Sequence, residues 1–299
     1  MKNYFLFLVV SFISCTTPLP AVVFQTDFGL KDGAVAEMKG VVLSVDPSLQ
    51  IFDITHEIPQ YNIWEAAYRL NQAAAFWPRG TVFVSVVDPG VGTARRSVVL
   101  RSGSGHYFVS PDNGTLTLIA KNLGIEEIRE IDEKTNRRKG SERSNTFHGR
   151  DVYAYTAARL AAGKISFHQV GKELPKEVVS FNYQEAILNN GIIKGNIPVL
   201  DTQFGNVWTN IPDSLIYKAG WNYGQVLAVE ILNTDSSVYK GGIPLVRTFG
   251  GVPEDSSLAY FNSLLNFSLA VNQGSFSKKH NIGSGPQWTI IISKFKNQE

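Results

Sequence analysis

The stretch "AVVFQTDFGLKDGAVAEMKGVVLSVDPSLQIFDIT" (residues 21–55) decides the fold class. Residues 21–26 form a short apolar run typical of a buried strand, and residues 32–45 form an amphipathic stretch that predicts a helix. Residues 49–55 are a second strand-like run. A strand, a helix and another strand in this order predict two parallel strands joined by a crossover helix.

The same alternation continues to about residue 160. Residues 62–77 carry apolar side chains at helical spacing, residues 80–87 read as a third strand, and residues 97–120 read as a hairpin that leads into a helix. A further helix is predicted over residues 149–163 and ends at its glycine. We therefore predict an α/β domain with a mainly parallel sheet and helices on both faces.

The character of the chain changes near residues 184–192. Helical periodicity disappears, and Pro, Asn and Gly separate short β-rich runs up to the C-terminus. This pattern predicts an all-β, barrel-like domain. The predicted organisation is a leader and tether over residues 1–20, the α/β domain over residues 21–185 and the β-barrel domain over residues 190–299.

Composition and short motifs exclude several function classes. The 299 residues are 43% hydrophobic and 18% charged, which describes a globular protein, and a net charge of +2 offers no electrostatic case for nucleic-acid binding. The basic stretch "NRRKGSER" (136–143) reads as a solvated loop. Because the chain has no HxxxH, HExxH, Cys/His cluster, GxSxG, Walker loop or GxGxxG, we predict no metal site, serine nucleophile or P-loop.

The N-terminus predicts export. Residues 1–15, "MKNYFLFLVVSFISC", hold one lysine, an eleven-residue apolar stretch and the only cysteine of the chain, Cys15. The stretch is too short to span a bilayer comfortably and fits a signal peptide. The Ser-Cys junction predicts a lipoprotein that touches the membrane only through a lipid anchor on Cys15. The alternatives are an ordinary secretory signal cut near Ala21 and a cytoplasmic protein.

Acidic residues follow the predicted strands where a ligand would bind. Asp27 comes after the first strand, Asp88 after the third, and Asp112 and Asn113 lie in "SPDNGT". One such aspartate is more often a turn former, but several at the carboxyl ends of one sheet suggest a site. His148 precedes a predicted helix, whose positive dipole end favours a neutral imidazole. A capping or packing role for this histidine is the alternative.

Five ordered motifs carry a resemblance. They are "TDFGxxDG" (26–33), "VVDPGVGTxRR" (86–96), "PDNG" (111–114), "FHGRD" (147–151) and "DxxFGNVWTNI" (201–211). Together they resemble the S-adenosylmethionine (SAM) hydroxide adenosyltransferase family, the SAM hydrolases related to the fluorinase and chlorinase halogenases. The resemblance covers about residues 22–290. It implies an α/β N-terminal domain and a β-barrel C-terminal domain.

The family reaction and assembly follow from the same resemblance. Water or hydroxide attacks the ribose C5′ of SAM, which releases methionine and leaves adenosine, and SAM is the substrate, with no cofactor. A homotrimer is implied, in which SAM lies between the N-terminal domain of one subunit and the C-terminal domain of its neighbour.

The resemblance also assigns roles to residues. The catalytic Asp–Arg–His triad falls on Asp88, Arg95 and His148. The implied substrate contacts are Asp27 on the ribose hydroxyls, Tyr61 along the methionine chain, Asp201 and Ser263 on the methionine ammonium, Phe204 and Phe249 on adenine, and Asn206 on the adenine edge. Core packing is the alternative for the two phenylalanines.

Two departures from the family pattern bear on function. Gly149 stands where the halogenases carry a halide-binding serine, and the halogenases lack the Asp–Arg pair, so halogenation is disfavoured. The family usually has Asn-Ser-x-Gly-aromatic where this chain reads "NSLLN" (262–266), so that Leu265 and Asn266 are expected to reshape the adenine pocket.

SAM hydrolysis is therefore the leading function, with halogenation third. A binding lipoprotein that captures a nucleoside without turnover is the alternative. The altered segment and export away from cytosolic SAM favour this alternative, and the intact triad opposes it.

Overall fold

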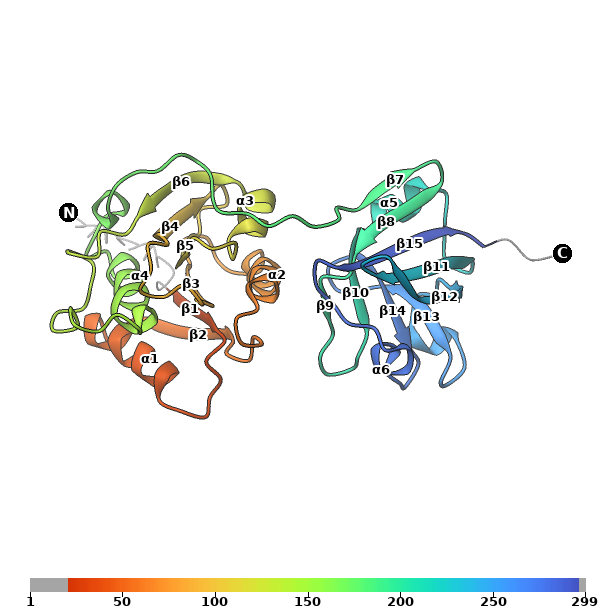
Figure 1. The fold of residues 1–299 in the computed structure, drawn as a ribbon, viewed down its shortest axis with the longest axis horizontal. Helices are drawn as coiled ribbons and strands as arrows, with labels where there is room; N and C mark the ends of the chain where they lie inside the picture. Colours follow the sequence, from red (N-terminus) through yellow and green to blue (C-terminus); the bar gives the residue numbers. More distant parts are fainter. Residues whose placement is uncertain (1–20, 296–299) are drawn as a thin grey trace, which may run out of the picture.

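The computed structural model describes residues 21–295, and the predicted leader with Cys15 lies outside the described residues. An α/β part extends to Val170, and an all-β part begins at Ile187 (Figure 1). Within residues 21–295, no helix has the length and apolar character needed to cross a membrane.

The first part is built on one six-stranded sheet. Its strands are β1 (Ala21–Thr26), β2 (Gln50–Thr55), β3 (Val82–Val86), β4 (Ser97–Ser102), β5 (Tyr107–Pro111) and β6 (Ile125–Glu130). The order is β2-β1-β3-β5-β4-β6. The first four strands in this order run parallel, whereas β4 pairs antiparallel with both β5 and β6. The predicted mainly parallel sheet is confirmed, as is the hairpin of β4 and β5.

Helices cover both faces of this sheet. They are α1 (Ala34–Val45), α2 (Ile63–Ala74), α3 (Thr117–Leu123), the π-helix η1 (Gly149–Ala154), α4 (Tyr155–Ala161) and the 3-10 helix η2 (Phe167–Val170). Because side chains alternate along a strand, Val22 and Phe24 pack in one core with Met38 of α1. Val23, between them, packs in the opposite core with Leu70 of α2.

The strand order reverses at β1, and this reversal positions the site. The chain passes from β1 to β2 on one side and then crosses to β3 on the other side. Ligands of open α/β sheets bind beyond the carboxyl ends of the strands at such a reversal. Asp27 and Asp88 follow β1 and β3, so both carboxylates lie at this point.

The second part contains two antiparallel sheets. One has the order β12-β11-β15-β8-β7 and the other β13-β14-β10-β9. The bounds are β7 (Ile187–Asn189), β8 (Ile192–Asn196), β9 (Val199–Leu200), β10 (Val207–Pro212), β11 (Val226–Asn233), β12 (Ser236–Pro244), β13 (Ser257–Phe261), β14 (Asn266–Val271) and β15 (Trp288–Lys294). Side chains of both sheets, among them Val229, Ile290 and Leu269, share one core.

The prediction of a barrel is wrong, because the two sheets do not close into one. Just beyond the end of β12, the edge of the larger sheet meets β13 at an isolated bridge between Leu245 and Ala259, so no continuous ladder joins the sheets there. Short helical segments also occur where no helix was predicted, namely α5 (Asp213–Lys218), the 3-10 helix η3 (Phe249–Gly251) and α6 (Phe276–His280). Segments of three to six residues are too short to show helical periodicity.

Residues 171–186 connect the two parts without a helix or strand of their own (Figure 1). Phe181 and Tyr183 of this segment pack on Trp64 of α2, with ring centroids 4.8 and 5.4 Å apart. The Trp64 indole N–H donates to the carbonyl of Pro198 in the second part at 2.7 Å. The domain bounds 21–185 and 190–299 stay a prediction.

Candidate functional site

A cavity of about 480 Å³ lies at the carboxyl ends of β1 and β3. Its wall includes four of the predicted site residues, Asp27, Tyr61, Asp88 and His148. These residues come from four separate regions of the sequence: they follow β1, β2 and β3 or precede η1. The reversal of strand order and the start of η1 bring them together.

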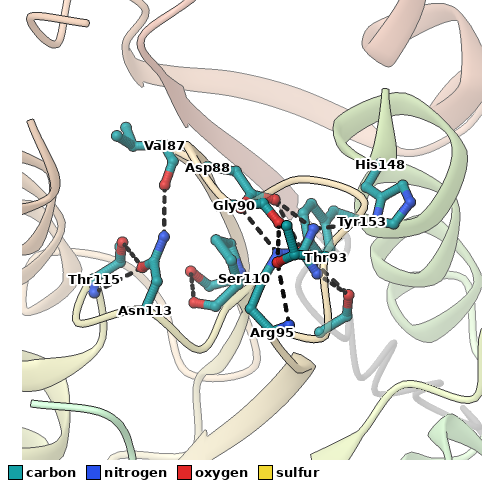
Figure 2. A network of polar contacts seen from close by, with 12 residues as sticks. Val87, Asp88, Gly90, Thr93, Arg95, Ser110, Asn113, Thr115, His148 and Tyr153 are labelled. Atoms are coloured by element: carbon teal, nitrogen blue, oxygen red, sulfur yellow. Dashed lines mark hydrogen bonds and ion pairs between the residues drawn. The ribbon is translucent and has the colours of Figure 1, made fainter. Parts of the chain in front are cut away.

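Asp88 and Arg95 form a two-point ion pair beside this cavity (Figure 2). Arg95 donates from Nε to one Asp88 oxygen at 2.9 Å and from Nη2 to the other at 2.5 Å. Two tight turns return the chain, since Val91 N–H donates to the Asp88 carbonyl and Thr93 N–H to the Gly90 carbonyl. Burial alone would lower the pKa of Arg95, but its hydrogen bond to Asp88 raises that pKa above the usual value.

Gly92 permits this path. Its φ of +76° is a left-handed conformation, and a Cβ there would lie 2.6 Å from the backbone oxygen of Asn145. A side chain at this position would therefore push the turn away from the neighbouring loop. The arginine that follows the buried strand is thus returned to the carboxylate at the strand's end.

His148 stands directly before the π-helix η1 and is 5% exposed. Its Nδ1 lies 3.1 Å from Nη2 of Arg95. Burial lowers the pKa of His148; nearby Glu133 opposes this shift, and Arg95 and Arg137 reinforce it. The predicted neutral imidazole agrees with this direction, but burial is its main cause. π-Helical turns are rare and are often found at functional sites.

The structure adds polar side chains that the sequence analysis did not name. The Tyr153 hydroxyl donates to Oδ2 of Asp88 at 3.3 Å, and burial raises the pKa of Tyr153. Arg137, from the predicted solvated loop, has a side chain only 11% exposed and places Nη2 3.1 Å from Nε2 of His148. The solvated-loop interpretation is therefore wrong for Arg137. A run of charges looks the same whether its members face solvent or a neighbouring histidine.

Asp27 and Tyr61 are joined through the backbone. The Tyr61 N–H donates to Oδ2 of Asp27 at 2.9 Å. Tyr61 has a φ of +64°, and its side chain is exposed. This contact fixes the Asp27 carboxylate relative to the loop that follows β2.

Asp112 and Asn113 do not line this cavity. Asp112 accepts a hydrogen bond from Arg96 at 2.5 Å and another from the Val179 N–H at 2.8 Å, so it holds the connecting segment. Asn113 donates to the Val87 carbonyl at 2.8 Å (Figure 2). Of the polar residues expected at the rim, the structure therefore brings only the two aspartates after β1 and β3 to the cavity.

A second cavity, of about 700 Å³, lies in the all-β part. The five remaining predicted residues all line it: Asp201, Phe204, Asn206, Phe249 and Ser263. Asn206 donates to Asp201 at 3.2 Å. Phe204 is 66% exposed and Phe249 38%, so the alternative that these rings are core residues is wrong. The two cavities share no lining residue.

Neither departure in "NSLLN" lies on the wall of the second cavity. Leu265 is exposed and has a φ of +59°, the left-handed conformation that glycine adopts at least cost. Asn266 begins β14 and lines a different cavity, between the two parts. The expected reshaping of the adenine pocket is therefore wrong for the side chains of these two residues. Leu265 instead introduces backbone strain.

Within residues 21–295, no group of three or more His, Cys, Asp or Glu side chains is arranged to hold a metal ion. The polar side chains that line the two cavities are carboxylates, amides, hydroxyls, one indole and one imidazole. These groups can bind hydroxyls, amines and a water molecule through hydrogen bonds.

Comparison with known proteins matches both parts of the chain. Residues 22–171 match the family described as SAM hydroxide adenosyltransferase N-terminal domain, and residues 195–289 match its C-terminal domain. The chain is 34% identical over 263 residues to an (R)-S-adenosyl-L-methionine hydrolase of Methanocaldococcus jannaschii, covering 86% of this chain and 87% of the relative. It is 30% identical over 300 residues to a fluorinase of Actinoplanes sp., covering 92% and 98%.

A solved structure is also similar. The crystal structure of an uncharacterized conserved protein from Thermotoga maritima has a TM-score of 0.84 and 34% identity. The match covers 91% of this chain and all of that chain. The Thermotoga maritima protein therefore has the same arrangement, a mixed α/β part followed by an all-β part.

These relatives correct the predicted localisation. The relatives named hydrolases are named for SAM, and an exported protein would be separated from SAM, a cytosolic metabolite. The prediction of an exported, lipid-anchored protein is wrong for this reason. Its sequence basis, residues 1–15, lies outside the described residues.

Proposed function

Since the chain belongs to the SAM hydroxide adenosyltransferase family, we propose that it hydrolyses SAM to adenosine and L-methionine. The observation that carries the proposal is the buried cluster of Asp88, Arg95 and His148, in which Asp88 and His148 line the first cavity and Arg95 contacts both. A protein that only bound a nucleoside would gain little from a polar cluster of this kind, because it has no water to orient.

The leaving group needs no proton from the protein. Water attacks C5′, a new C–O bond forms, and the C5′–S bond breaks with its electron pair going to the sulfonium sulfur. Methionine leaves as a neutral thioether, so no proton has to be supplied to it. The protein must instead hold water in line with the C5′–S bond and take its proton.

The cluster is suited to holding and polarising the water. Both Asp88 oxygens are held by Arg95, which fixes the carboxylate at the cavity wall. His148 is buried and its pKa is lowered, so its ring is neutral near pH 7. We propose these three residues as the catalytic group, with SAM as the substrate and no separate cofactor.

Substrate contacts are proposed for both cavities. Asp27 would bind the ribose hydroxyls, with Tyr61 beside the methionine chain. The second cavity would hold adenine between its aromatic rings, with Asn206 at the adenine edge and Asp201 and Ser263 near the methionine ammonium. Because the two cavities have no wall in common, we propose that a second copy of the chain completes each site, in a homotrimer of two-domain subunits.

Mixing two inactive variants tests the shared site. His148→Ala damages only the first cavity, and Asp201→Ala damages only the second. If each site combines cavities of two subunits, mixed oligomers contain some sites with both cavities intact, and activity returns on mixing. Activity that stays absent in mixtures shown by mass to have exchanged subunits would contradict the shared site. Light scattering of the wild-type protein measures the oligomeric state directly.

Halogenation is the second candidate, because the fluorinase relative aligns along most of its length. Gly149 offers no hydroxyl, and a Cβ at this position would already lie 3.4 Å from the ring of Phe28. Incubation with SAM, with and without fluoride or chloride, followed by chromatography of the nucleosides, decides among the functions. We expect adenosine in every case. A 5′-halogenated nucleoside would indicate a halogenase, and bound but unconverted SAM would indicate a binding protein.

A further inference from the structure

The proposed catalytic group continues into a layer of side chains outside the family motifs. Nη1 of Arg95 donates to the Ser97 hydroxyl at 2.8 Å, which donates to Oε1 of Glu133 at 2.9 Å. Nη2 of Arg137 donates to Oε2 of Glu133 at 2.7 Å and lies 3.1 Å from Nε2 of His148. Because His148 contacts Arg95 through its other nitrogen, these five side chains form a closed ring of polar contacts.

Both ring nitrogens of His148 therefore face guanidinium groups. A guanidinium donates hydrogen bonds and cannot accept them. A protonated imidazole would direct both of its N–H groups at donors, whereas a neutral imidazole offers one nitrogen as an acceptor. The carboxylate oxygen of Glu133 nearest to Nδ1 is 3.8 Å away, beyond hydrogen-bond distance. This geometry favours a neutral ring.

Arg137 is held firmly in its place. Its Nη1 donates to the Ser144 carbonyl at 3.1 Å, and its side chain is 11% exposed. The preceding residue, Asn136, is buried and donates to the backbone carbonyls of Gln169 and Val170 at 3.1 and 2.9 Å. The loop between β6 and η1 is thus anchored next to Arg137, and contacts within the chain position the guanidinium.

We propose that Arg137, braced by Glu133, is a positioning residue for the hydrolysis: it orients the His148 imidazole through Nε2 and keeps the ring uncharged. This inference rests on the proposed function, because it assumes that His148 takes part in activating water. Arg137 acts on the reaction only through His148.

The charges around His148 predict that two substitutions shift the pH profile in opposite directions. The groups that face it are Arg95 and Arg137, which disfavour a protonated ring, and Glu133 and Asp88, which favour it. Arg137→Gln removes a cation and should move the acid limb of the pH profile of kcat/KM upward by about one pH unit. Glu133→Gln removes an anion and should move that limb downward. If the two substitutions only disturbed packing, both variants would have a lower kcat. The acid limb would not then move up in one variant and down in the other.

Two further variants sharpen the comparison. Arg137→Lys keeps the charge and should return the acid limb toward the wild-type position. Lys139→Gln removes a positive charge from an exposed side chain of the same loop and should leave the limb in place. An acid limb unchanged in Arg137→Gln, or one moved equally by Lys139→Gln, would overturn the proposal.

A second measurement covers variants that are folded but too slow to assay. Titration of the imidazole carbon resonances of His148, followed by NMR in isotope-labelled protein, should show a higher pKa in Arg137→Gln than in wild type. An unchanged titration would overturn the inference. If wild-type protein does not hydrolyse SAM, the proposed function fails, whereas the titration still decides whether Arg137 keeps His148 neutral.

Discussion

Replacement of Arg95 by alanine removes the side chain that joins the proposed catalytic group. Four polar contacts disappear, two with Asp88, one with Ser97 and one with His148. Asp88 then keeps the Tyr153 hydroxyl at 3.3 Å, but its carboxylate is only 5% exposed. Leaving a buried carboxylate without its cation costs about 3–5 kcal/mol of folding free energy. Losing the orientation of Asp88 and His148 should lower turnover about 10²-fold or more.

The neighbouring Arg96 provides a matched control. Arg96 donates to the carboxylate of Asp112 at 2.5 Å, and that carboxylate is 1% exposed. Asp112 does not line the cavity and keeps its hydrogen bond from the Val179 N–H. Because it also leaves a buried carboxylate without its cation, Arg96→Ala should reduce the free energy of unfolding by about 3–5 kcal/mol. Turnover of the folded fraction should be unchanged.

The two variants are compared by two measurements. Initial rates of adenosine formation are followed by chromatography at a temperature where both proteins are folded, and urea unfolding gives the loss of stability. We expect both variants to be less stable than wild type and only Arg95→Ala to be slow. If folded Arg95→Ala converts SAM as fast as Arg96→Ala, the ion pair with Asp88 is structural, and the catalytic assignment is wrong.

Four further outcomes are expected. Asp27→Asn should weaken binding of a ribose ligand by about 1–3 kcal/mol and should weaken binding of its 2′-deoxy analogue less. If wild type and Asp27→Asn discriminate equally between the two ligands in calorimetry, the ribose contact is refuted. Gly149→Ser should slow hydrolysis, because its Cβ would already touch the Phe28 ring at 3.4 Å and its hydroxyl adds a further atom there, and an unchanged rate of adenosine formation would contradict this. Leu265→Gly should raise the free energy of unfolding by roughly 0.5–1 kcal/mol by relieving a positive φ, and a lower melting temperature would argue against strain there. The pKa of His148 is lower in the folded than in the unfolded protein, so protonation of the unfolded chain destabilises the fold increasingly as pH falls below about 6.5 and not well above it. Wild type should therefore lose more stability than His148→Gln between pH 7.5 and 5.5, and equal losses in urea titrations would contradict the shift.

The elements of the α/β part could be predicted because their signals are local. Alternation within β1 sends Val22 and Phe24 to one core and Val23 to the other, and both cores exist as the pattern implies. The positions of Asp27 and Asp88 follow from the same reasoning, since parallel strands end at one edge of a sheet. Strand β6 was not predicted, because its residues, "IEEIRE", carry mostly charged side chains.

The all-β part shows where local signals end. Individual strands such as β11 and β15 could be predicted from their apolar runs. Whether two sheets close into a barrel depends on hydrogen bonds between edge strands that lie far apart in the chain. Here the edge beyond β12 meets β13 only through the bridge between Leu245 and Ala259, and no pattern in either segment indicates this.

The sequence by itself determined the alternation of strands and helices, the two aspartates at the strand ends and the ordered motifs that identify the family. These features depend on side-chain periodicity and on residues close together in the chain. Only the tertiary structure decided that the nine predicted binding and wall residues divide between two cavities, and that Arg137 faces His148 instead of solvent. The direction of a long charged side chain depends on which partners the folded loop brings within hydrogen-bond distance. A run of charged residues is compatible with either outcome until the fold places an imidazole and a carboxylate beside one of them.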